Sequence, residues 1–548
     1  MSPVVLRFCV YLYSVWLISR SNAANNPHIV FIMADDMGWN DVSFHGSDQI
    51  PTPNIDSLGY NGVILNRHYV QPTCTPTRAS LMTGRHPIHT GQHWPYYSTQ
   101  KSALPLTEKI LPEYLKELGY ATHVVGKWHL GFYKREFTPL QRGFDSHLGY
   151  WGGSQSYYDH VHEERIGNKT LVGYDMRRDN TVAWELSGQY ATDLFSREAV
   201  RLIKEHPPNV PMFLLLNHLA VHAGNAGKLL EAPQEVVDRF RYIPDPNRRT
   251  YAAMMSKLDD SVGEVVEALG EKDMLRNSIV VFLSDNGAPN LGHFNNWGSN
   301  YPWRGHKATL WEGGVRTPSV VWSPLISNPS RVSEELMHVT DWLPTLLRAA
   351  GYQKPLTYID GVDQWLSICY DLPSPRTSLL LDLYDTNNMR SIIMGHYKYI
   401  YGATSYLQYN DDAADHSSYL NFDSITSRNI PSYDVTQVTT SKTWIQTKKL
   451  RKYRLPSSQV IKMRKKATIS CERKDTSPLN CDDTPCIFDL AEDACEQENI
   501  FWKYPILGVF MGAVLDNYKL DAIPDDIIFF DLDSDPERFN GTWDNWVT

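Results

Sequence analysis

The amino-acid sequence predicts an α/β sandwich in which helices flank a large mixed β-sheet whose strands are mostly parallel. One observation is a set of short, nearly continuous apolar runs, which are typical of strands buried on both faces of a parallel sheet. A second is that stretches with helical spacing of apolar residues separate these runs, as expected where helices join parallel strands. The apolar runs occupy residues 28–34, 212–217 and 278–283, and the helical patterns occupy 106–118 and 251–269. The first helical pattern leads through Gly119 into a strand-like stretch at 121–125.

A chain of 548 residues is too long to fold around one ordinary hydrophobic core, so we expect one large domain and one smaller domain. The character of the sequence changes near residue 369, which places the N-terminal domain at 24–368 and the C-terminal domain at 369–548. Residues 379–401 have strand patterns. Residues 403–480 are rich in Tyr, Ser, Asp and Thr with weak periodicity, and we interpret them as a polar surface insertion in the C-terminal domain.

Residues 1–23 have the pattern of a signal peptide. Arg7 precedes an apolar run at 10–18, and residues 21–23 include the small side chains that signal peptidase accepts. The run is shorter than the about 20 residues of a membrane-spanning helix, and no other stretch is long and apolar enough to span a membrane. We therefore expect a chain that begins near Asn25 after cleavage, enters the secretory pathway, and resides in the lysosome or outside the cell.

The net charge of −10 argues against a nucleic-acid partner, because such proteins bind phosphates mainly through Lys and Arg. An anionic small substrate would then need local positive groups or a metal ion. One basic concentration lies at 448–466. It could bind a polyanion such as a sulfated glycan, although a solvated face or a processing site is the favoured interpretation.

Entry into the secretory pathway favours disulfides and N-glycosylation. Four cysteines cluster near the C-terminus and predict two local bridges: Cys471, Cys481, Cys486 and Cys495. Three pairings are open, of which Cys486–Cys495 closes the simplest loop. Cys9 leaves with the signal peptide, and Cys369 has no obvious partner. The Asn-x-Thr triplets at Asn168 and Asn540 are candidate glycosylation sites.

Polar side chains follow the ends of several predicted strands. Because ligands bind beyond the carboxyl ends of strands in open α/β sheets, we expect these side chains to converge on one pocket. For any single cluster a strand-capping turn is an equal alternative, but four together argue against it. The clusters are Asp35 with Asp36, Lys127 with His129, His222, and Asp285 with Asn286.

The segment Cys74-Thr-Pro-Thr-Arg78, followed by Thr83-Gly84-Arg85, is the most specific motif in the chain. It resembles the signature of the sulfatase family, in which the cysteine is oxidised during secretion to the aldehyde formylglycine. That resemblance implies the formylglycine-generating enzyme as a partner. It spans about 27–402, returns at 487–490, and includes these matches in the family's order: Asp35-Asp36, Gly126-Lys127-Trp128-His129, Ser284-Asp285-Asn286-Gly287, and Lys307 before 311–316.

The sequence is most similar to the arylsulfatase B group, which acts on N-acetylgalactosamine 4-sulfate, through residues 38–41, 71–72 and 126–131. The resemblance implies an alkaline phosphatase-like sandwich with a smaller C-terminal α+β domain that has a short antiparallel sheet. It also implies hydrolysis of sulfate esters, with release of inorganic sulfate. The substrate would be a sulfated small molecule or glycan, and the group does not settle which.

The acidic residues of the pocket suit a hard cation. Three carboxylates and an amide oxygen, with no cysteine or histidine-rich ligand set nearby, favour one calcium ion over zinc. The predicted ligands are Asp35, Asp36, Asp285 and Asn286, and the resemblance adds an oxygen of modified residue 74 and the substrate sulfate.

The resemblance also assigns catalytic roles. Arg78 and Lys127 would hold the hydrated aldehyde, and Lys307 would grip the sulfate. His129 would deprotonate the second hydroxyl for sulfate release, a role suited to a side chain that titrates near neutrality. His222 and Lys307 would assist the leaving group, while Asp285 could activate the first hydroxyl. A sulfate ester needs these groups because its oxygens repel nucleophiles and its alkoxide leaves poorly.

The loop after His222 departs from the family, because Ala223-Gly224 replaces a polar residue and proline. His222 lies nine residues after Phe213, as the family pattern requires, and is therefore preferred to His218. Three alternatives stay open. They are a hydrolase of small sulfated metabolites rather than glycosaminoglycans, a phosphatase or phosphodiesterase of the same fold, and a sulfated-glycan binding protein with a decayed site.

Overall fold

The computed structural model describes residues 26–290, 295–384, 388–402, 430–451, 455–471, 479–524 and 529–547, and the structural statements below concern these residues. The signal peptide predicted at 1–23, the expected start near Asn25 and part of the 403–480 stretch lie outside them. Within the described residues, no helix is both long and apolar enough to cross a bilayer.

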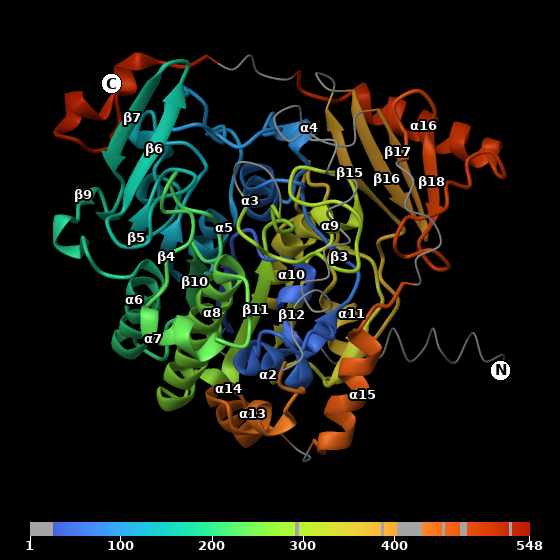
Figure 1. Cartoon of the computed structure of the whole chain (residues 1–548), viewed down its shortest axis with the longest axis horizontal. Helices are drawn as coiled ribbons and strands as arrows, with labels where there is room; N and C mark the ends of the chain where they lie inside the picture. Colours follow the sequence, from blue (N-terminus) through green and yellow to red (C-terminus); the bar gives the residue numbers. More distant parts are fainter. Residues whose placement is uncertain are drawn as a thin grey trace.

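A ten-stranded sheet forms the centre of the larger part of the molecule (Figure 1). Its five middle strands, β11, β1, β10, β4 and β5, are parallel, and antiparallel neighbours extend the sheet on both sides. The predicted fold class, a large mixed sheet flanked by helices, is confirmed. The order across the sheet is β13 (Arg331–Ser333), β2 (Val63–Leu65), β12 (Ser319–Trp322), β11 (Ser278–Ser284), β1 (His28–Ala34), β10 (Met212–Asn217), β4 (Ala121–Lys127), β5 (Ser146–Tyr150), β8 (Arg177–Arg178) and β9 (Thr181–Val182).

The central strands are those that the apolar runs predict. β1 and β10 have the predicted bounds, whereas β11 continues to Ser284 and β4 continues to Lys127. Every residue of β1, β10 and β11 is buried, which explains why their sequences lack the alternation of half-exposed strands.

Helices cover both faces of the sheet, and alternate residues of each strand point into two apolar cores. On one face Val30 and Ile32 of β1 pack against α2 (Pro53–Asn61), α6 (Ala191–Glu205) and α8 (Pro246–Glu271). On the other face Ile29 and Phe31 belong to a core with α3 (Cys74–Thr83), α5 (Leu111–Glu117), α10 (Trp342–Ala349) and α11 (Trp365–Tyr370). Short elements complete this part: α4 (Pro87–Thr90), α7 (Gln234–Val237), α9 (Glu312–Val315), β3 (His68–Tyr69) and β14 (Met337–His338).

Helix α5 begins at Leu111 and not at the expected residue 106. Pro112 lies in its first turn, the only part of a helix where proline costs no hydrogen bond. Helix α8 is longer than the pattern at 251–269, because the Asp245 side chain caps its N-terminus by accepting from Arg248 N over 2.7 Å.

The described parts of the 403–480 stretch form three helices that pack against the large domain. These are α13 (Val435–Thr440), α14 (Lys442–Thr447) and α15 (Ser457–Ala467). Val438, Trp444 and Val460 are buried in the core beneath α2 and α8. The stretch that we interpreted as an insertion of the C-terminal domain therefore adds a layer to the N-terminal one.

Three of the basic side chains within 448–466 attach this layer to the large part. Arg464 donates to Oδ1 of Asp48 over 2.7 Å, Lys466 donates to a backbone carbonyl of β13 over 2.8 Å, and Arg451 donates to a backbone carbonyl of α2 over 3.2 Å. These contacts occupy the three cations in a structural role and weaken the case for a polyanion site.

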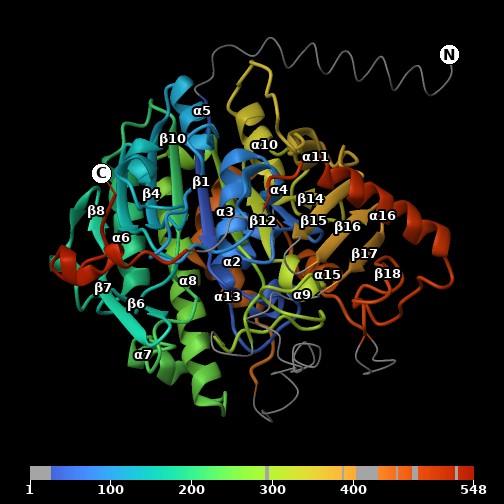
Figure 2. The same cartoon turned by 90° about the horizontal axis from the view of Figure 1, so that it is seen from above.

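A four-stranded antiparallel sheet forms a smaller part of the molecule beside the large one, as the resemblance implied. Its strands are β15 (Ser378–Tyr384), β16 (Met389–Met394), β17 (Tyr397–Tyr401) and β18 (Cys486–Asp489), and α16 (Pro505–Lys519) lies over its outer side (Figure 2). The predicted domain boundary at 368/369 runs through α11, whose Ile368 and Cys369 belong to the core of the large part.

A buried charge network joins the two parts. Lys398 of β17 contacts Oε1 of Glu312 over 2.9 Å and Oε1 of Glu496 over 2.7 Å, and all three side chains are inaccessible to solvent. Glu312 opens α9 of the large part and also accepts from Arg316 over 3.1 Å. Burial and the neighbouring Glu312 raise the pKa of Glu496 to about 7.

The chain ends on the large part again. Residues 529–547 pack along a hairpin formed by β6 (Val161–Ile166) and β7 (Lys169–Tyr174), where Figure 1 shows the C-terminus. Trp543 is completely buried and donates from Nε1 to the carbonyl of His162 over 3.1 Å. The hairpin is thus held by a segment far away in sequence.

The disulfides are Cys471–Cys495 and Cys481–Cys486, so the preferred Cys486–Cys495 pairing is wrong. Cys481 lies beside the small sheet, where its carbonyl accepts a hydrogen bond from Gly402 N. Cys495 instead packs with Cys471 near Trp39. Cys486 thus pairs with the nearer cysteine, because Cys481 and Cys486 are separated by only 5 residues. Cys369 is free and buried, and burial raises the pKa of its thiol to about 12. The side chains of Asn168, in the β6–β7 turn, and of Asn540 are both exposed, and their glycosylation stays a prediction.

Candidate active site

The predicted polar clusters lie together beyond the carboxyl ends of the central strands. Ala34 of β1 pairs with Ser284 of β11, so Asp35-Asp36 and Asp285-Asn286 leave adjacent parallel strands at the same level. Oδ1 of Asp285 accepts from Asp36 N over 3.1 Å, and Nδ2 of Asn286 donates to Oδ1 of Asp36 over 2.6 Å. All four side chains are inaccessible to solvent.

Three cations face these three carboxylates. Lys127 Nζ lies 2.7 Å from Oδ2 of Asp35, Arg78 Nη2 lies 2.7 Å from Oδ2 of Asp285, and Lys307 Nζ lies 2.7 Å from Oδ1 of Asp36. Burial alone would favour the neutral acid, but Lys127, followed by His222 and Arg78, holds the pKa of Asp35 below its usual value. Burial and the neighbouring Asp35 raise the pKa of Asp285.

Two buried oxygens in this cluster, Oδ1 of Asp35 and Oδ1 of Asn286, accept no hydrogen bond. Buried polar atoms normally have a partner, so these two are available to a cation. Asp35, Asp36 and His222 also form a group whose ligand atoms lie within 4.8 Å of one another. The carboxylates therefore fit a metal ion, and His222 is a neighbour that the ligand set expected from the sequence did not include.

Cys74 is the first residue of α3, at the end of the helix that faces the acidic cluster. Its thiol is almost completely buried, and burial raises the pKa of that thiol, although Lys127 and Lys307 oppose the shift. Arg78 follows one turn later on the same side of α3, which is why the motif spacing places both beside Asp285. The helix ends at Gly84, whose φ of 69° suits a residue without Cβ.

His129 is held in one orientation and one tautomer. Nε2 faces the carbonyl of Tyr96 at 3.0 Å, so this nitrogen carries the proton, and the buried Nδ1 has no hydrogen-bond partner. Burial, with Lys127 adding to it, lowers the pKa of His129 well below 6.5. Its φ of 54° lies in the left-handed region, as does the φ of 61° at Asp36. Such backbone strain in non-glycine residues occurs preferentially at functional sites.

His222 reaches the cluster and His218 does not. Nδ1 of His222 faces the carbonyl of Ala223 at 2.6 Å, while Nε2 lies 3.4 Å from Lys307 Nζ and 3.4 Å from Oδ2 of Asp36. His218 instead lies 3.0 Å from the hydroxyl of Ser261, inside the protein. Burial lowers the pKa of His222, so that the neutral ring faces Lys307.

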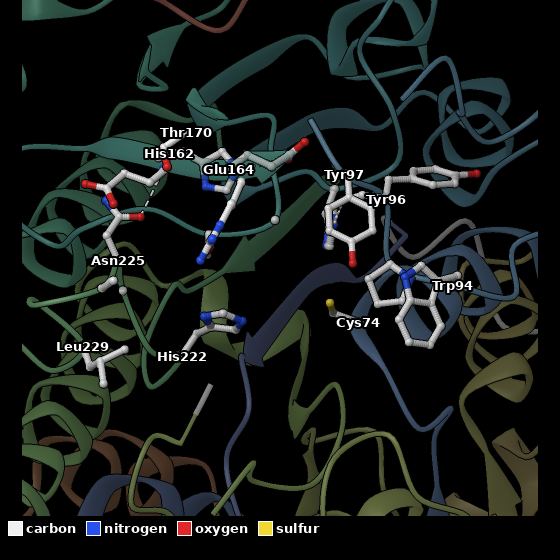
Figure 3. Close-up of a pocket in the computed structure, with 18 of the residues that line it drawn as sticks. Cys74, Trp94, Tyr96, Tyr97, His162, Glu164, Thr170, His222, Asn225 and Leu229 are labelled. Carbon is white, nitrogen blue, oxygen red and sulfur yellow. Dashed lines mark hydrogen bonds and ion pairs between the residues drawn. The ribbon is translucent and has the colours of Figure 1, made fainter. Parts of the chain in front are cut away.

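Part of this cluster borders a cavity of about 660 Å³, shown in Figure 3. Cys74, His129, His222 and Lys307 are among its lining residues. Three groups of wall residues were not predicted from the sequence. They are Trp94, Tyr96 and Tyr97 near Cys74, the hairpin residues His162, Glu164 and Arg165, and Asn225 with Leu229 after His222.

The hairpin wall is held in place by Asn225, which follows the loop of His222. Its Oδ1 accepts from Glu163 N over 3.1 Å, and its Nδ2 donates to the carbonyl of Val161 over 2.8 Å. The cluster of Trp94, Tyr96 and Tyr97 was visible in the sequence, but no local pattern indicated that it faces a cavity. Long-range packing decides that placement.

Comparison with known proteins agrees with this geometry. A sequence model of the sulfatase family, described as Sulfatase, matches residues 27–352. The chain therefore belongs to the sulfatase family. That family is a class of sulfuric ester hydrolases, which fits the buried cations around Cys74.

Two relatives agree with this family, and one solved structure shares its fold. It is 43% identical to arylsulfatase J of Mus musculus over 360 residues, which are 65% of this chain and only 58% of that protein. It is 31% identical to N-acetylgalactosamine-6-sulfatase of Mus musculus over 411 residues, covering 69% and 72% of the two chains. The crystal structure of the PsFucS1 sulfatase from Pseudoalteromonas sp. shares the fold, with a TM-score of 0.64 at 23% identity and coverage of 96% and 97%. These relatives establish the family, and the closer grouping with arylsulfatase B stays a prediction.

Proposed function

We propose that this protein hydrolyses sulfate esters and releases inorganic sulfate, with residue 74 acting in its formylglycine form beside one calcium ion. One observation carries the proposal. Cys74, within Cys-Thr-Pro-Thr-Arg78, opens a buried helix beside a cluster of three carboxylates and three cations, and it lines the same cavity as Lys307 of that cluster. In the unmodified chain, Sγ of Cys74 stands where the oxygen of the aldehyde would lie.

The nucleophile explains why a cysteine precursor is used. A serine could attack sulfur, but it would leave a stable sulfated enzyme. The hydrate of formylglycine has two hydroxyls on one carbon. One hydroxyl can attack sulfur. Deprotonation of the second hydroxyl then restores the aldehyde and expels sulfate. Lys127 and Arg78 are placed to hold those hydroxyls and to counter their charge.

Asp35, Asp36, Asp285 and Asn286 would hold the metal ion. The Oδ1 atoms of Asp35 and Asn286, which accept no hydrogen bond, and an oxygen-only set with three carboxylates support a hard cation such as calcium. A bound divalent cation supplies charge that neutralises the sulfate oxygens. His222 is a poorer ligand for such a cation, because hard cations prefer oxygen ligands and its imidazole nitrogen carries no negative charge.

Two histidines have different tasks. His129, neutral and protonated on Nε2, offers the lone pair of Nδ1 as the base that takes the proton of the second hydroxyl. Lys307, which lies between Asp36 and His222, would bind the sulfate and give a proton to the leaving oxygen, and the neutral His222 beside it would assist the departure of the leaving group. Asp285 would accept the proton of the attacking hydroxyl.

The wider biology follows from the same proposal. The cavity has room for one sulfated ring or for the end of a sulfated glycan, and its aromatic wall at Trp94 and Tyr97 offers a flat apolar surface. Conversion of Cys74 requires the formylglycine-generating enzyme, and therefore passage through the secretory pathway to the lysosome or the exterior. Glycans at Asn168 and Asn540 belong to the same route.

The test begins with mass spectrometry of the peptide that contains residue 74, isolated from protein made in a secretory host. We expect formylglycine there, and sulfate release from an aryl sulfate without phosphate release from the matched aryl phosphate. Cys74→Ala should abolish turnover and leave folding intact, while the control Cys369→Ala should retain activity. Unmodified cysteine in a protein that still releases sulfate, or full activity of Cys74→Ala, would refute the assigned nucleophile.

A further inference from the structure

The residues that line the active-site cavity include two with a permanent positive charge, Lys307 and Arg165. Lys307 has an acidic partner, since its Nζ lies 2.7 Å from Oδ1 of Asp36. Arg165, on β6 of the hairpin wall, donates from Nε to the carbonyl of Gly167 over 3.1 Å, and within the described residues it makes no ion pair. The Nη nitrogens of Arg165 are therefore available to a ligand in the cavity.

Thr170 places a hydroxyl beside Arg165. The two residues pair directly across β6 and β7. Side chains of such a pair project from the same face of a hairpin, with their Cβ atoms about 5 Å apart. Both residues line the cavity, and Figure 3 shows Thr170 on the same side of the cavity as His222, away from Trp94. A guanidinium with a neighbouring hydroxyl is a donor set that suits a carboxylate or a sulfate.

The strand that carries Arg165 has a fixed position relative to His222. Asn225, three residues after His222, accepts from Glu163 N over 3.1 Å and donates to the carbonyl of Val161 over 2.8 Å. Because His222 is the residue placed beside the leaving oxygen, this wall faces the alcohol part of the ester. The cavity of about 660 Å³ lies within the range of about 300–1,000 Å³ that holds drug-sized ligands, so it has room for an alcohol larger than the sulfate itself.

We propose that Arg165, with Thr170, binds a second anionic group on the alcohol part of the substrate and so selects sulfate esters that carry a further carboxylate or sulfate. The inference rests on the proposed sulfatase function and names a substrate class for the same cavity. Arg165 acts on substrate binding and not on the bond that breaks, because it belongs to the hairpin wall and not to the charge cluster beside Cys74.

The test compares four sulfate esters with the full-length, secreted protein. They are the methyl glycoside of a sulfated N-acetylhexosamine, the same glycoside with a second sulfate, a disaccharide in which the sulfated sugar is joined to a sugar carboxylate, and the methyl ester of that disaccharide. We expect kcat/KM to be higher for at least one dianionic compound than for its neutral counterpart. The compound that shows the preference identifies the second anion as a sulfate or a carboxylate.

Arg165→Gln should reduce that preference by about tenfold, mainly through KM, because a charge-assisted contact with a part of the substrate that does not react is lost. Arg165→Lys should retain part of the preference, since it keeps the charge but not the planar pair of donors. Raising the ionic strength should weaken the preference of the wild type, because the wall is open to solvent.

Two further variants separate a local contact from a change in overall charge. Arg135→Gln removes an exposed arginine that does not line the cavity, and it should leave the preference unchanged. Glu163 lies two residues before Arg165 on the same face of β6, about 7 Å away along the strand. Glu163→Gln removes a charge that repels an anion there, so it should increase the preference.

Equal kcat/KM for the dianionic and neutral compounds, or a preference that Arg165→Gln leaves intact, would overturn the inference while the proposed function stands. Absence of sulfate release from all four compounds would contradict the proposed function instead. Calorimetric titration of Cys74→Ala protein with the same compounds then measures the preference as binding. Tighter binding of a dianionic compound, lost in Cys74→Ala/Arg165→Gln protein, supports the inference, and equal affinities overturn it.

Discussion

Arg78 donates from Nη2 to Oδ2 of Asp285 over 2.7 Å, and both side chains are almost completely buried. This pair ties the helix that Cys74 opens to the end of β11. The distance between Cys74 and the acidic cluster is therefore set by a buried ion pair as well as by the fold. Removing one partner of such a pair leaves an uncompensated charge in the interior.

We expect Arg78→Ala to lower kcat/KM for an aryl sulfate by at least about 100-fold, because a cation that faces the developing charge is lost. The free energy of unfolding should fall by about 3–5 kcal/mol, since Asp285 stays buried without its partner. Thermal denaturation and steady-state kinetics measure both effects. Arg276→Ala, which removes an exposed ion pair with Asp273, is the control. It should change neither the free energy of unfolding nor the activation free energy of catalysis by more than about 1 kcal/mol.

Metal removal should distinguish the two possible ligand sets. Chelation of calcium should abolish turnover and lower the melting temperature, because a ligand that binds only the native state stabilises it. Readdition of Ca²⁺ should restore both. Calorimetry should show that Asp36→Asn weakens calcium binding by more than about tenfold and that His222→Ala weakens it less. Recovery with Zn²⁺ alone, and equal losses in the two variants, would instead identify Asp35, Asp36 and His222 as the ligands.

His129 gives a prediction about pH. Its pKa lies well below 6.5 because of burial and Lys127, so the neutral base persists in mildly acidic solution. We therefore expect kcat to stay level from neutral pH down to 6.5 and to decline only at lower pH, where Nδ1 takes up a proton. A decline that begins above 6.5 would contradict this assignment.

His129→Ala should also stall the second step. Acid-quenched protein should then carry a sulfo group on residue 74, visible as a mass increase of that peptide, because nothing removes the proton of the second hydroxyl. His222→Ala is the comparison, since it should slow the first step and leave residue 74 free of sulfate. If His129→Ala protein is folded and contains formylglycine, but its residue 74 carries no sulfo group, the result would be evidence against His129 as the base.

The C-terminal segment should position the wall of the cavity. Trp543→Ala is expected to lower the free energy of unfolding by about 3–5 kcal/mol through lost packing, and to raise KM more than it lowers kcat. The wall residue His162 loses its support in that variant, whereas the base of the cavity is untouched. Trp543→Phe keeps an aromatic ring but loses the Nε1 bond and part of the packing of the indole, so its stability and KM should fall between those of the wild type and of Trp543→Ala. A change in kcat with KM constant would show that the segment does not act through the wall.

The sequence predicted the parts of the fold that are encoded locally. The strands β1, β10 and β11 are buried on both faces, so their composition marks them without reference to any neighbour. Helices α13, α14 and α15 were missed, because they are short and polar and are stabilised by side chains such as Trp444 that enter a core built from α2 and α8. The disulfide pairing failed for the same reason, since Cys471 and Cys495 meet through packing beside Trp39.

The candidate site divides in the same way. Its base follows from motifs at strand ends, because parallel neighbours such as β1 and β11 bring their final residues to one level. Its walls come from a hairpin and from loops whose positions depend on contacts across hundreds of residues. No spacing in the sequence indicates that Glu163 contacts Asn225, or that Trp543 supports His162.

The network around Lys398 couples the unfolding of the large sheet to the unfolding of the small sheet. Glu312, which it contacts, lies only a short loop away from Lys307. If the small sheet unfolded, Lys398 would move away from Glu312 and Glu496, and two negative side chains would remain near the loop that carries Lys307. Heating should therefore unfold both sheets in a single cooperative transition, and enzymatic activity should be lost when the small sheet unfolds.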